Sequence, residues 1–146
     1  QMATSNAATT YLEDKILSFI FKNNAASFTT PGNSLYVGLA VGSPSAADRD
    51  AGTLTEATFG SYARQQVTAA NWTLASASTD QQTVTNAANI EFPASTGTNN
   101  TVTIAFIADA ATSGNILFVG ELDASKTIAT GDIFRINAGN LTIELK

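Results

Sequence analysis

The chain has 146 residues, of which 44% are hydrophobic and only 13% charged, and it carries a net charge of −5 with a sequence pI near 4.4. An acidic chain with scattered lysines and arginines has no basic footprint, so we expect neither nucleic acid nor a membrane as a partner. Cysteine and histidine are absent, which excludes disulfides, zinc sites built from those residues, cysteine nucleophiles and histidine general bases, and we expect no metal and no cofactor.

The chain begins with one predicted helix, at about residues 10–22. Four apolar side chains recur at helical spacing and share one face: Leu12, Ile16, Phe19 and Ile20. Thr10 and Glu13 have the spacing of a capping box at the start of this helix. Leu17 and Phe21 widen the apolar surface beyond that face. We therefore expect the helix to be well buried, either under its own sheet or against a neighbouring subunit.

After the helix, apolar residues alternate with a period of two, which is typical of β-strands. The expected strands are residues 34–41, 62–69, 72–75, 83–92, 101–108 and 116–122, followed by a closing hairpin of 132–137 and 140–146. Residues 42–61 are long for a loop, so they are either a functional excursion or contain short unrecognised elements. The pattern predicts a single, mainly β domain over residues 1–146: an antiparallel β-sandwich or jelly-roll-like fold with one N-terminal α-helix.

Acidic residues are the first candidates for chemistry. Asp48 and Asp50 could donate oxygen ligands to calcium, but the spacing of an EF-hand loop is missing, so we interpret them as part of a solvated loop. Four more acidic residues follow in the C-terminal half: Asp109, Glu121, Asp123 and Asp132. Paired carboxylates perform glycoside hydrolysis, but these aspartates lie at predicted strand ends, where Asp is a common turn residue. We interpret the four as structural and expect no catalytic residue.

Trp72, Tyr62 and Arg64 are the remaining structural or interface candidates. Trp72 most often means a core or inter-sheet anchor in a small β domain, with ligand stacking as the alternative. Arg64 follows Tyr62 at period two in a neutral segment, with no carboxylate constellation nearby in the sequence. We therefore interpret Arg64 as a scaffold cation that pairs with a carboxylate or caps carbonyl oxygens, within the fold or at a subunit contact.

Several short segments, in their order along the chain, resemble a known family. They are residues 35–45 (LYVGLAVGSPS), 60–65 (GSYARQ), 89–95 (NIEFPAS), 106–111 (FIADAA), 113–122 (SGNILFVGEL), 126–132 (KTIATGD) and 138–143 (AGNLTI). From about residue 6 to residue 146, the chain is similar to small virion proteins of tailed bacteriophages that are usually labelled tail fibre or minor structural proteins. Ser61 stands where a second glycine is common in that family.

The resemblance implies a non-enzymatic virion structural protein that acts as a homo-oligomer. Its expected partners are copies of itself and other virion proteins, such as the major capsid or tail proteins, with a host surface glycan as a further candidate. It would be assembled in the host bacterial cytoplasm and reside on the particle surface. One placement is a head decoration or cement protein, which the compact size without fibrous repeats favours. The other is a tail-fibre or tail-tip component that presents residues 42–58 to a host receptor.

Two further function classes stay open from the residues alone. A carbohydrate-binding module would use Trp72, Tyr62 or Tyr36 as stacking platforms. A glycosidase would use the acidic residues of the C-terminal half. Binding to a glycan array would support the first class, and an Asp-to-Asn series would separate it from the second.

Overall fold

The computed structural model describes residues 7–24, 34–78 and 81–145. The elements are β1 (Ala7–Ala8), α1 (Thr10–Phe21), β2 (Tyr36–Val41), α2 (Ala46–Ala51), β3 (Thr55–Glu56), β4 (Gln65–Gln66), the 3₁₀ helix η2 (Ala69–Asn71), β5 (Trp72–Ser78), β6 (Gln81–Asn86), β7 (Ile90–Glu91), β8 (Asn100–Ala108), β9 (Ile116–Ile128), β10 (Arg135–Ile136) and β11 (Thr142–Leu145). All strand pairs among them are antiparallel. The mainly β architecture with an N-terminal helix is therefore confirmed.

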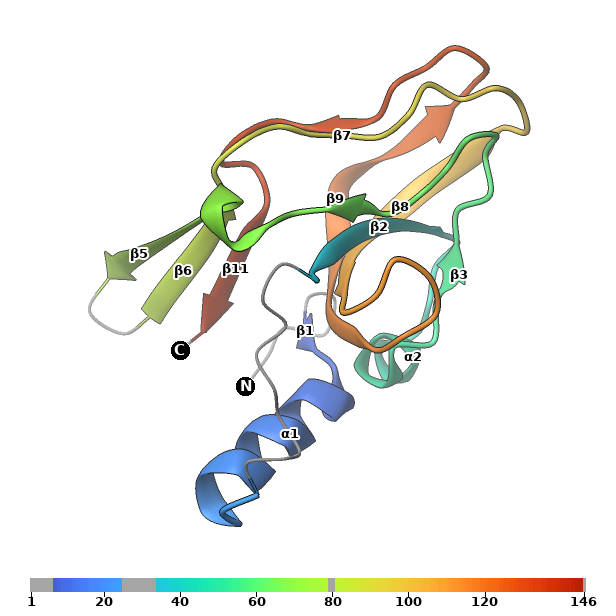
Figure 1. Cartoon of the computed structure of the whole chain (residues 1–146). Coiled ribbons are helices and arrows are strands. Elements are labelled where there is room, and N and C mark those ends of the chain that lie inside the picture. The colour runs from blue at the N-terminus through green and yellow to red at the C-terminus, as the bar shows by residue number, and fades with distance from the viewer. Residues whose placement is uncertain (1–6, 25–33, 79–80, 146) are drawn as a thin grey trace.

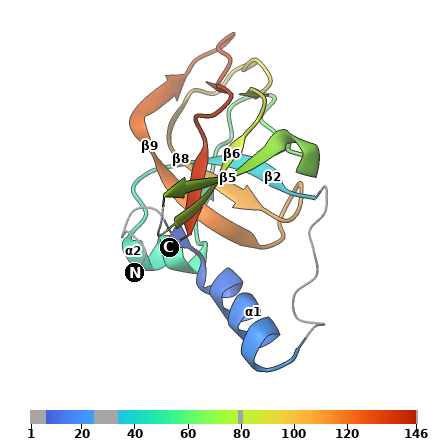
Figure 2. The same ribbon diagram turned by 90° about the vertical axis from the view of Figure 1, so that its left-hand side faces the viewer.

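The strands form three sheets (Figure 1). The main sheet has six strands in the order β1-β9-β8-β2-β3, with β4 also paired to β2. β10 and β7 form a two-stranded ribbon, and β11, β6 and β5 form a three-stranded sheet that we call the small sheet. The small sheet lies to one side of the main sheet, and α1 protrudes below it (Figures 1 and 2). Because the strands divide in this way, the jelly-roll comparison stays a prediction.

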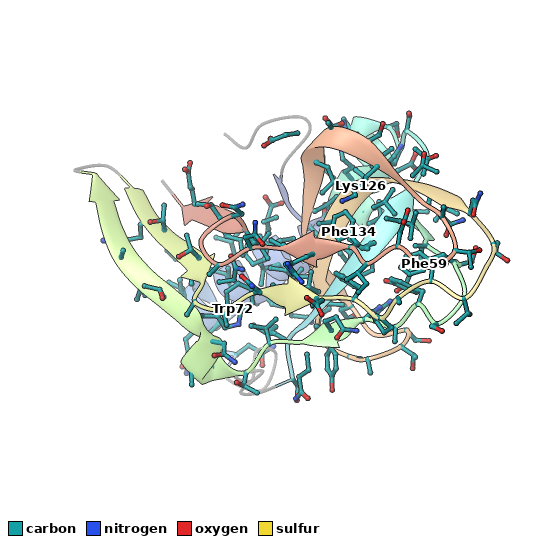
Figure 3. All side chains as sticks on the ribbon, turned by 90° about the horizontal axis from the view of Figure 1, so that it is seen from above. Phe59, Trp72, Lys126 and Phe134 are labelled. Atoms are coloured by element: carbon teal, nitrogen blue, oxygen red, sulfur yellow. The ribbon has the colours of Figure 1, made fainter. Side chains whose placement is uncertain are left out.

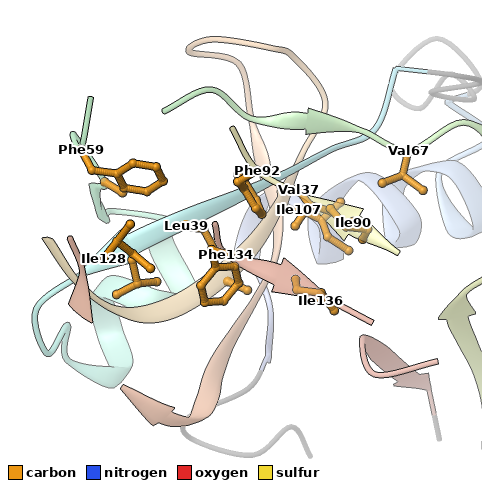
Figure 4. Close-up of a cluster of buried hydrophobic side chains, with 13 residues drawn as sticks. Val37, Leu39, Phe59, Val67, Ile90, Phe92, Ile107, Ile128, Phe134 and Ile136 are labelled. Atoms are coloured by element: carbon orange, nitrogen blue, oxygen red, sulfur yellow. The ribbon is translucent and has the colours of Figure 1, made fainter. Parts of the chain in front are cut away.

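The hydrophobic core lies on the face of the main sheet that the β7–β10 ribbon covers (Figure 4). Its thirteen residues are Val37, Leu39, Ala57, Phe59, Val67, Ile90, Phe92, Val102, Ala105, Ile107, Ile128, Phe134 and Ile136. The Phe92 ring stacks on Tyr62 at 6.1 Å and meets Phe134 edge-on at 5.8 Å, two favourable aromatic geometries. On the opposite face, a second cluster forms around Phe106. The main sheet is thus buried on both faces in its central strands, which explains the continuous apolar run in β8.

The N-cap of α1 is Thr9, not Thr10 as the sequence predicted. The buried Thr9 hydroxyl accepts a hydrogen bond from the amide of Leu12 at 3.4 Å and donates one to the carbonyl of Ile116 at 2.6 Å. One side chain therefore caps the helix and ties its start to β9. The predicted extent of the helix is otherwise confirmed.

Most of α1 is not covered by the described part of its own chain. Leu12 is buried, and Ile16 packs against the cluster that Leu12 forms with β9. Phe19 and Ile20, from the same predicted face, are 48% and 60% exposed. Burial under its own sheet is therefore wrong for the second half of the helix, because only Leu12 and Ile16 reach β9. Burial against a neighbouring subunit stays a prediction.

Residues 42–61 contain two short elements, α2 and β3, which agrees with one of the two alternatives predicted for this segment. Ser45 and Asp48 form a reciprocal capping box at the start of α2. Gly52 ends this helix with a φ of 71°, a left-handed conformation that glycine adopts without strain. The Ser45 hydroxyl, followed by the Ser45 amide, lowers the pKa of Asp48. Asp48 is thus a helix-capping residue rather than an unstructured loop residue.

The closing hairpin predicted for residues 132–137 and 140–146 is wrong. β10 pairs with β7 in the ribbon, and β11 pairs with β6 in the small sheet. The expected strand 83–92 is likewise divided between β6 and β7, and only Gln65–Gln66 of the expected strand 62–69 is paired. The segment from β6 to β7 and the segment from β10 to β11 thus both run between the small sheet and the β7–β10 ribbon.

Asn86 explains this change of sheet. Its side chain is buried, and its Nδ2 donates to the carbonyls of Ala88 at 2.8 Å and Asn137 at 3.0 Å. Its Oδ1 accepts the amide of Leu141 at 2.9 Å. These bonds join the two chain segments at the crossing, where the ladder bonds of a hairpin of residues 132–146 are not formed.

Candidate functional site

Arg64 lies at the centre of a polar cluster beside β2 and β8, with a side chain that is 6% exposed. Its Nε donates to Glu56 Oε2 at 2.8 Å and its Nη2 donates to Glu56 Oε1 at 3.0 Å, which is a two-pronged ion pair. Its Nη1 donates to the carbonyls of Ala110 and Ser113, each at 2.8 Å. Arg64 therefore pairs with a carboxylate and caps carbonyl oxygens within the fold.

Tyr62 completes this arrangement, and we call Glu56, Tyr62 and Arg64 the Arg64 cluster. The Tyr62 hydroxyl donates to Glu56 Oε2 at 2.7 Å and accepts the amide of Leu39 at 2.9 Å. Burial, followed by the neighbouring Glu56 carboxylate, raises the pKa of Tyr62 well above its ordinary value. The hydroxyl thus stays protonated, and its hydrogen-bonding capacity is used between β2 and β3.

Glu56 is held in its charged form by the other two members of the cluster. Burial alone would raise the pKa of Glu56, but hydrogen bonds from Arg64 and Tyr62 outweigh burial and lower this pKa. A carboxylate with a lowered pKa is a poor general acid near neutral pH. The cluster is therefore suited to holding structure rather than to proton transfer.

The Phe106 ring packs against the guanidinium of Arg64 and requires a glycine at position 38. The guanidinium carbon of Arg64 lies 5.1 Å from the centroid of the Phe106 ring, a cation–π distance. Phe106 is paired in register with Gly38 on β2. A Cβ atom at position 38 would overlap the Phe106 ring, so glycine makes room for the ring that Arg64 covers.

The turn between β8 and β9 is held from two sides. Arg64 binds its carbonyls from within, as described above. On the outer side, Asp109 Oδ1 accepts the amide of Asn115 at 2.7 Å and Asp109 Oδ2 accepts Asn115 Nδ2 at 2.9 Å. Asp109 is thus a turn residue, as its place at a strand end predicted.

Two of the other acidic candidates, Asp132 and Glu121, also have structural partners. Asp132 Oδ2 accepts the amide of Ala129 at 3.0 Å, and Glu121 pairs with Arg49 at 3.2 Å. Asp123 lies on the exposed second half of β9. Among the described residues, no three acidic side chains gather as metal ligands. The structure therefore distributes these carboxylates over separate turns and strands.

Trp72 packs against the core cluster from the start of β5, and so connects the small sheet to the main core. It lies toward the small sheet, away from Phe59 at the other end of the core (Figure 3). Its indole Nε1 is buried and meets no acceptor within the described residues. The polar edge of the ring therefore does not face solvent, which weakens the case for a ligand-stacking platform. Tyr62, the second platform candidate, is engaged in the Arg64 cluster.

Two apolar surfaces remain uncovered by the described residues. The first, which we call the α1 apolar surface, consists of Leu17, Ile20 and Phe21, of which Phe21 is 75% exposed. The second is Leu74 on β5, at 76% exposure. Single exposed apolar residues are common, but Leu17, Ile20 and Phe21 lie three and four positions apart on one side of the helix and form a contiguous patch.

Residues 7–144 match the model of the family described as Podophage GP4 fiber I protein gp80. The chain belongs to this family. The match confirms the resemblance to phage virion structural proteins of the tail-fibre kind and makes the chain a virion-associated protein. No curated protein matches the chain. Neither helix in the described ranges has the length and apolar character needed to span a bilayer.

Three features of this gp80-family chain escaped the sequence analysis. Glu56 lies eight positions before Arg64, across irregular backbone, so no periodicity connects the two. Gly38 reads as an ordinary strand residue until Phe106 is placed opposite to it. Leu74 was included in a predicted strand, but its exposure depends on β5 being the last strand of the small sheet.

Proposed function

We propose that this gp80-family chain is a non-enzymatic structural component of a phage tail fibre, built into the particle surface through contacts with copies of itself and with other virion proteins. The family description supports the fibre placement over the decoration or cement role that the compact size without fibrous repeats favoured. The observation that carries the proposal is the α1 apolar surface, which has no role in the chain's own described core.

The size of the α1 apolar surface suits a protein contact. From Ile16 to Phe21 only Ser18 is polar, and a helical segment that is apolar nearly all round is a buried segment in its functional state. The exposed parts of Leu17, Ile20 and Phe21 offer on the order of 300 Å² of apolar area, since a large aromatic side chain covers about 150–250 Å² and these three are 55%, 60% and 75% exposed. A standard interface takes about 800 Å² from each partner. The helix therefore supplies less than half of one such interface and requires further contacts to complete it.

The polar groups support a structural role. The charged members of the Arg64 cluster, and the acidic turn residues Asp109 and Asp132, bind other groups of the same chain. Such bonds hold loops in one conformation, which suits a component that transmits load rather than one that turns over a substrate.

Quantitative mass spectrometry of purified virions tests the placement. We expect a copy number that matches the symmetry of the tail and its fibres. A copy number that matches the capsid lattice would instead support the decoration or cement role. Absence of the chain from virions would overturn both placements.

Light scattering of the purified chain tests the contacts between copies. We expect a mass above that of the monomer at micromolar concentration. A monomer at all concentrations would remove self-association from the proposal, and the α1 apolar surface would then be assigned to another virion protein. Immunogold labelling of intact virions, with antibody to this chain, would locate it on the fibre.

A further inference from the structure

We propose that the outer edge of β5 pairs with β5 of a second copy, antiparallel, about a twofold axis at Leu74. This inference rests on the self-association in the proposed function and names the strand that performs it. The α1 apolar surface alone is too small for a standard interface. Main-chain pairing through β5 would supply the further contact that the interface needs.

The outer edge of β5 differs from the other sheet edges in the described part of the chain. β5 ends the small sheet, is seven residues long, and contains no charged residue and no proline. The outermost strands of the main sheet, β1 and β3, have two residues each, and so does β4. Natural sheets prevent unwanted pairing with short, charged or proline-containing edges. β5 lacks these protections.

The other long edges carry charges. β9 extends beyond its pairing with β1 through Glu121, Asp123 and Lys126. β11, at the opposite edge of the small sheet, contains Glu144. A strand that pairs with its own copy about a twofold axis would bring such like charges together, which is unfavourable. β5 has no like charges to oppose.

An apolar row on the small sheet ends abruptly at this edge. Leu74 is paired in register with Val84, and Val84 is paired with Ile143, so the three side chains lie on one face. Ile143 packs against the main core, whereas Leu74 at the other end is 76% exposed. Adding β5 of a second copy doubles this row and buries Leu74 against its counterpart. The exposed leucine thus acquires a packing role.

Symmetry selects the central residue. In an antiparallel pair related by a twofold axis normal to the sheet, one residue lies directly opposite its own copy. Residues at equal distances before and after it pair with each other, so with Leu74 on the axis Thr73 of one copy lies opposite Ala75 of the other. Leu74 is the only large apolar side chain among the exposed residues Thr73, Leu74 and Ala75. Placing Leu74 on the axis buries the most apolar area. The regular part of the edge extends to Ser76, where the register with β6 shifts.

Single cysteines test this pairing, because the chain contains no cysteine of its own. Directly opposed residues in an antiparallel pair have Cα atoms about 4.5–5.5 Å apart, which a disulfide can span. We expect Leu74→Cys, under mild oxidation, to run mostly at twice the monomer mass on a non-reducing gel. Thr73→Cys and Ala75→Cys are expected to link poorly, because their own copies lie a diagonal step away.

Thr142→Cys is the matched control. Thr142 and Thr73 are both exposed threonines and are paired with the same residue, Thr85, from opposite sides of the small sheet. Thr142→Cys and Thr73→Cys therefore make the same substitution on the same face of the small sheet, one at the β11 edge and the other at the β5 edge. Circular dichroism and the melting temperature of the reduced variants check that each one folds.

The outcomes separate this inference from the proposed function. Linking at Leu74 with no linking at Thr142 supports β5 pairing. Linking at Thr142 instead, or an oligomer by light scattering without linking at any β5 position, overturns β5 pairing and leaves self-association standing. A monomer by light scattering overturns self-association and this inference together, while virion copy number still tests the structural role.

Discussion

At the scale of single residues, Arg64 joins parts of the chain that lie far apart in the sequence. Its guanidinium reaches Glu56 at the end of β3 and the carbonyls of Ala110 and Ser113 in the β8–β9 turn. Its flat face rests on Phe106. Planar, five-donor geometry makes all these contacts available at once, which an ammonium group cannot do.

Replacing Arg64 with alanine should lower the free energy of unfolding by about 2–4 kcal/mol, because it leaves Glu56 and two carbonyls without their donor. Arg64→Lys should recover only part of this loss. Denaturant unfolding followed by fluorescence of the single tryptophan measures it. Arg135→Ala is the control, since its pair with Glu91 is half exposed on both sides and should be worth less than about 1 kcal/mol. Equal losses in Arg64→Ala and Arg135→Ala would contradict the structural role of the cluster.

Glu56 makes stability depend on pH with a definite sign. Its folded-state pKa is lowered, so its contribution is fully present above the unfolded-state value of about 4.3 and is lost as pH falls through the folded-state pKa. The difference in unfolding free energy between the wild type and Glu56→Gln should therefore be constant near neutral pH and shrink below about pH 4. Urea titrations at several pH values measure this difference. Growth of the difference toward low pH would show that the assigned sign is wrong.

At the scale of elements, α1 has two halves with different functions. The first half is anchored to β9 by Thr9, Leu12 and Ile16. The second half carries the α1 apolar surface away from the main sheet (Figure 1). The first half is thus packed into the fold, and the second half carries the surface used in the proposed contacts.

Ile20→Glu should separate these two functions. The charge lies on an exposed helical position, so the melting temperature of the monomer should change little, within about 0.5 kcal/mol of stability. Self-association should weaken roughly tenfold or more, because a charge would be buried in an apolar contact. Sedimentation velocity over a concentration series measures this. Thr10→Glu, which adds the same charge at the exposed first turn, should leave association unchanged. Equal weakening in both variants would point to net charge rather than to the apolar surface.

The sequence predicted those elements whose signal is local. α1, β2, β8 and the first half of β9 follow from the apolar pattern of their own residues, although only the start of the predicted α1 face is buried. The closing hairpin failed because the partner choice of β10 and β11 depends on Asn86, which contacts Asn137 from 51 residues away. For α2 the signal was present, since Ser45 and Asp48 have capping-box spacing and Gly52 follows as a helix stop. The free edge of β5 could not be predicted, because it depends on the order of the strands in the small sheet and apolar periodicity does not give that order.

At the scale of the whole molecule, charge is sparse and the two uncovered apolar surfaces contain none of it. The net charge of −5 resides on scattered side chains, several of which are paired within the fold. The surfaces proposed for contacts between copies, the α1 apolar surface and the β5 edge, contain no charged residue. Assembly should therefore depend on apolar burial and main-chain pairing rather than on ion pairs.

Raising sodium chloride to about 1 M should accordingly leave the oligomer intact, although it screens charges over more than a few ångströms. Ammonium sulfate should strengthen association, because it favours burial of apolar surface. Sedimentation equilibrium across a salt series measures both effects. Dissociation by sodium chloride would indicate that ion pairs, not these surfaces, hold the copies together.

The buried Asn86 side chain has a consequence for the order of events during synthesis. β2, β8 and β9 are complete before residues 137–141 leave the ribosome, so the central main sheet has its strands early. Asn86 then still lacks the partners that lie 51 and 55 residues downstream, and β6 lacks β11. A polar side chain without partners is costly to bury, so the small sheet closes late. The small sheet, which carries the edge proposed for pairing between copies, is therefore completed only when the chain is almost finished.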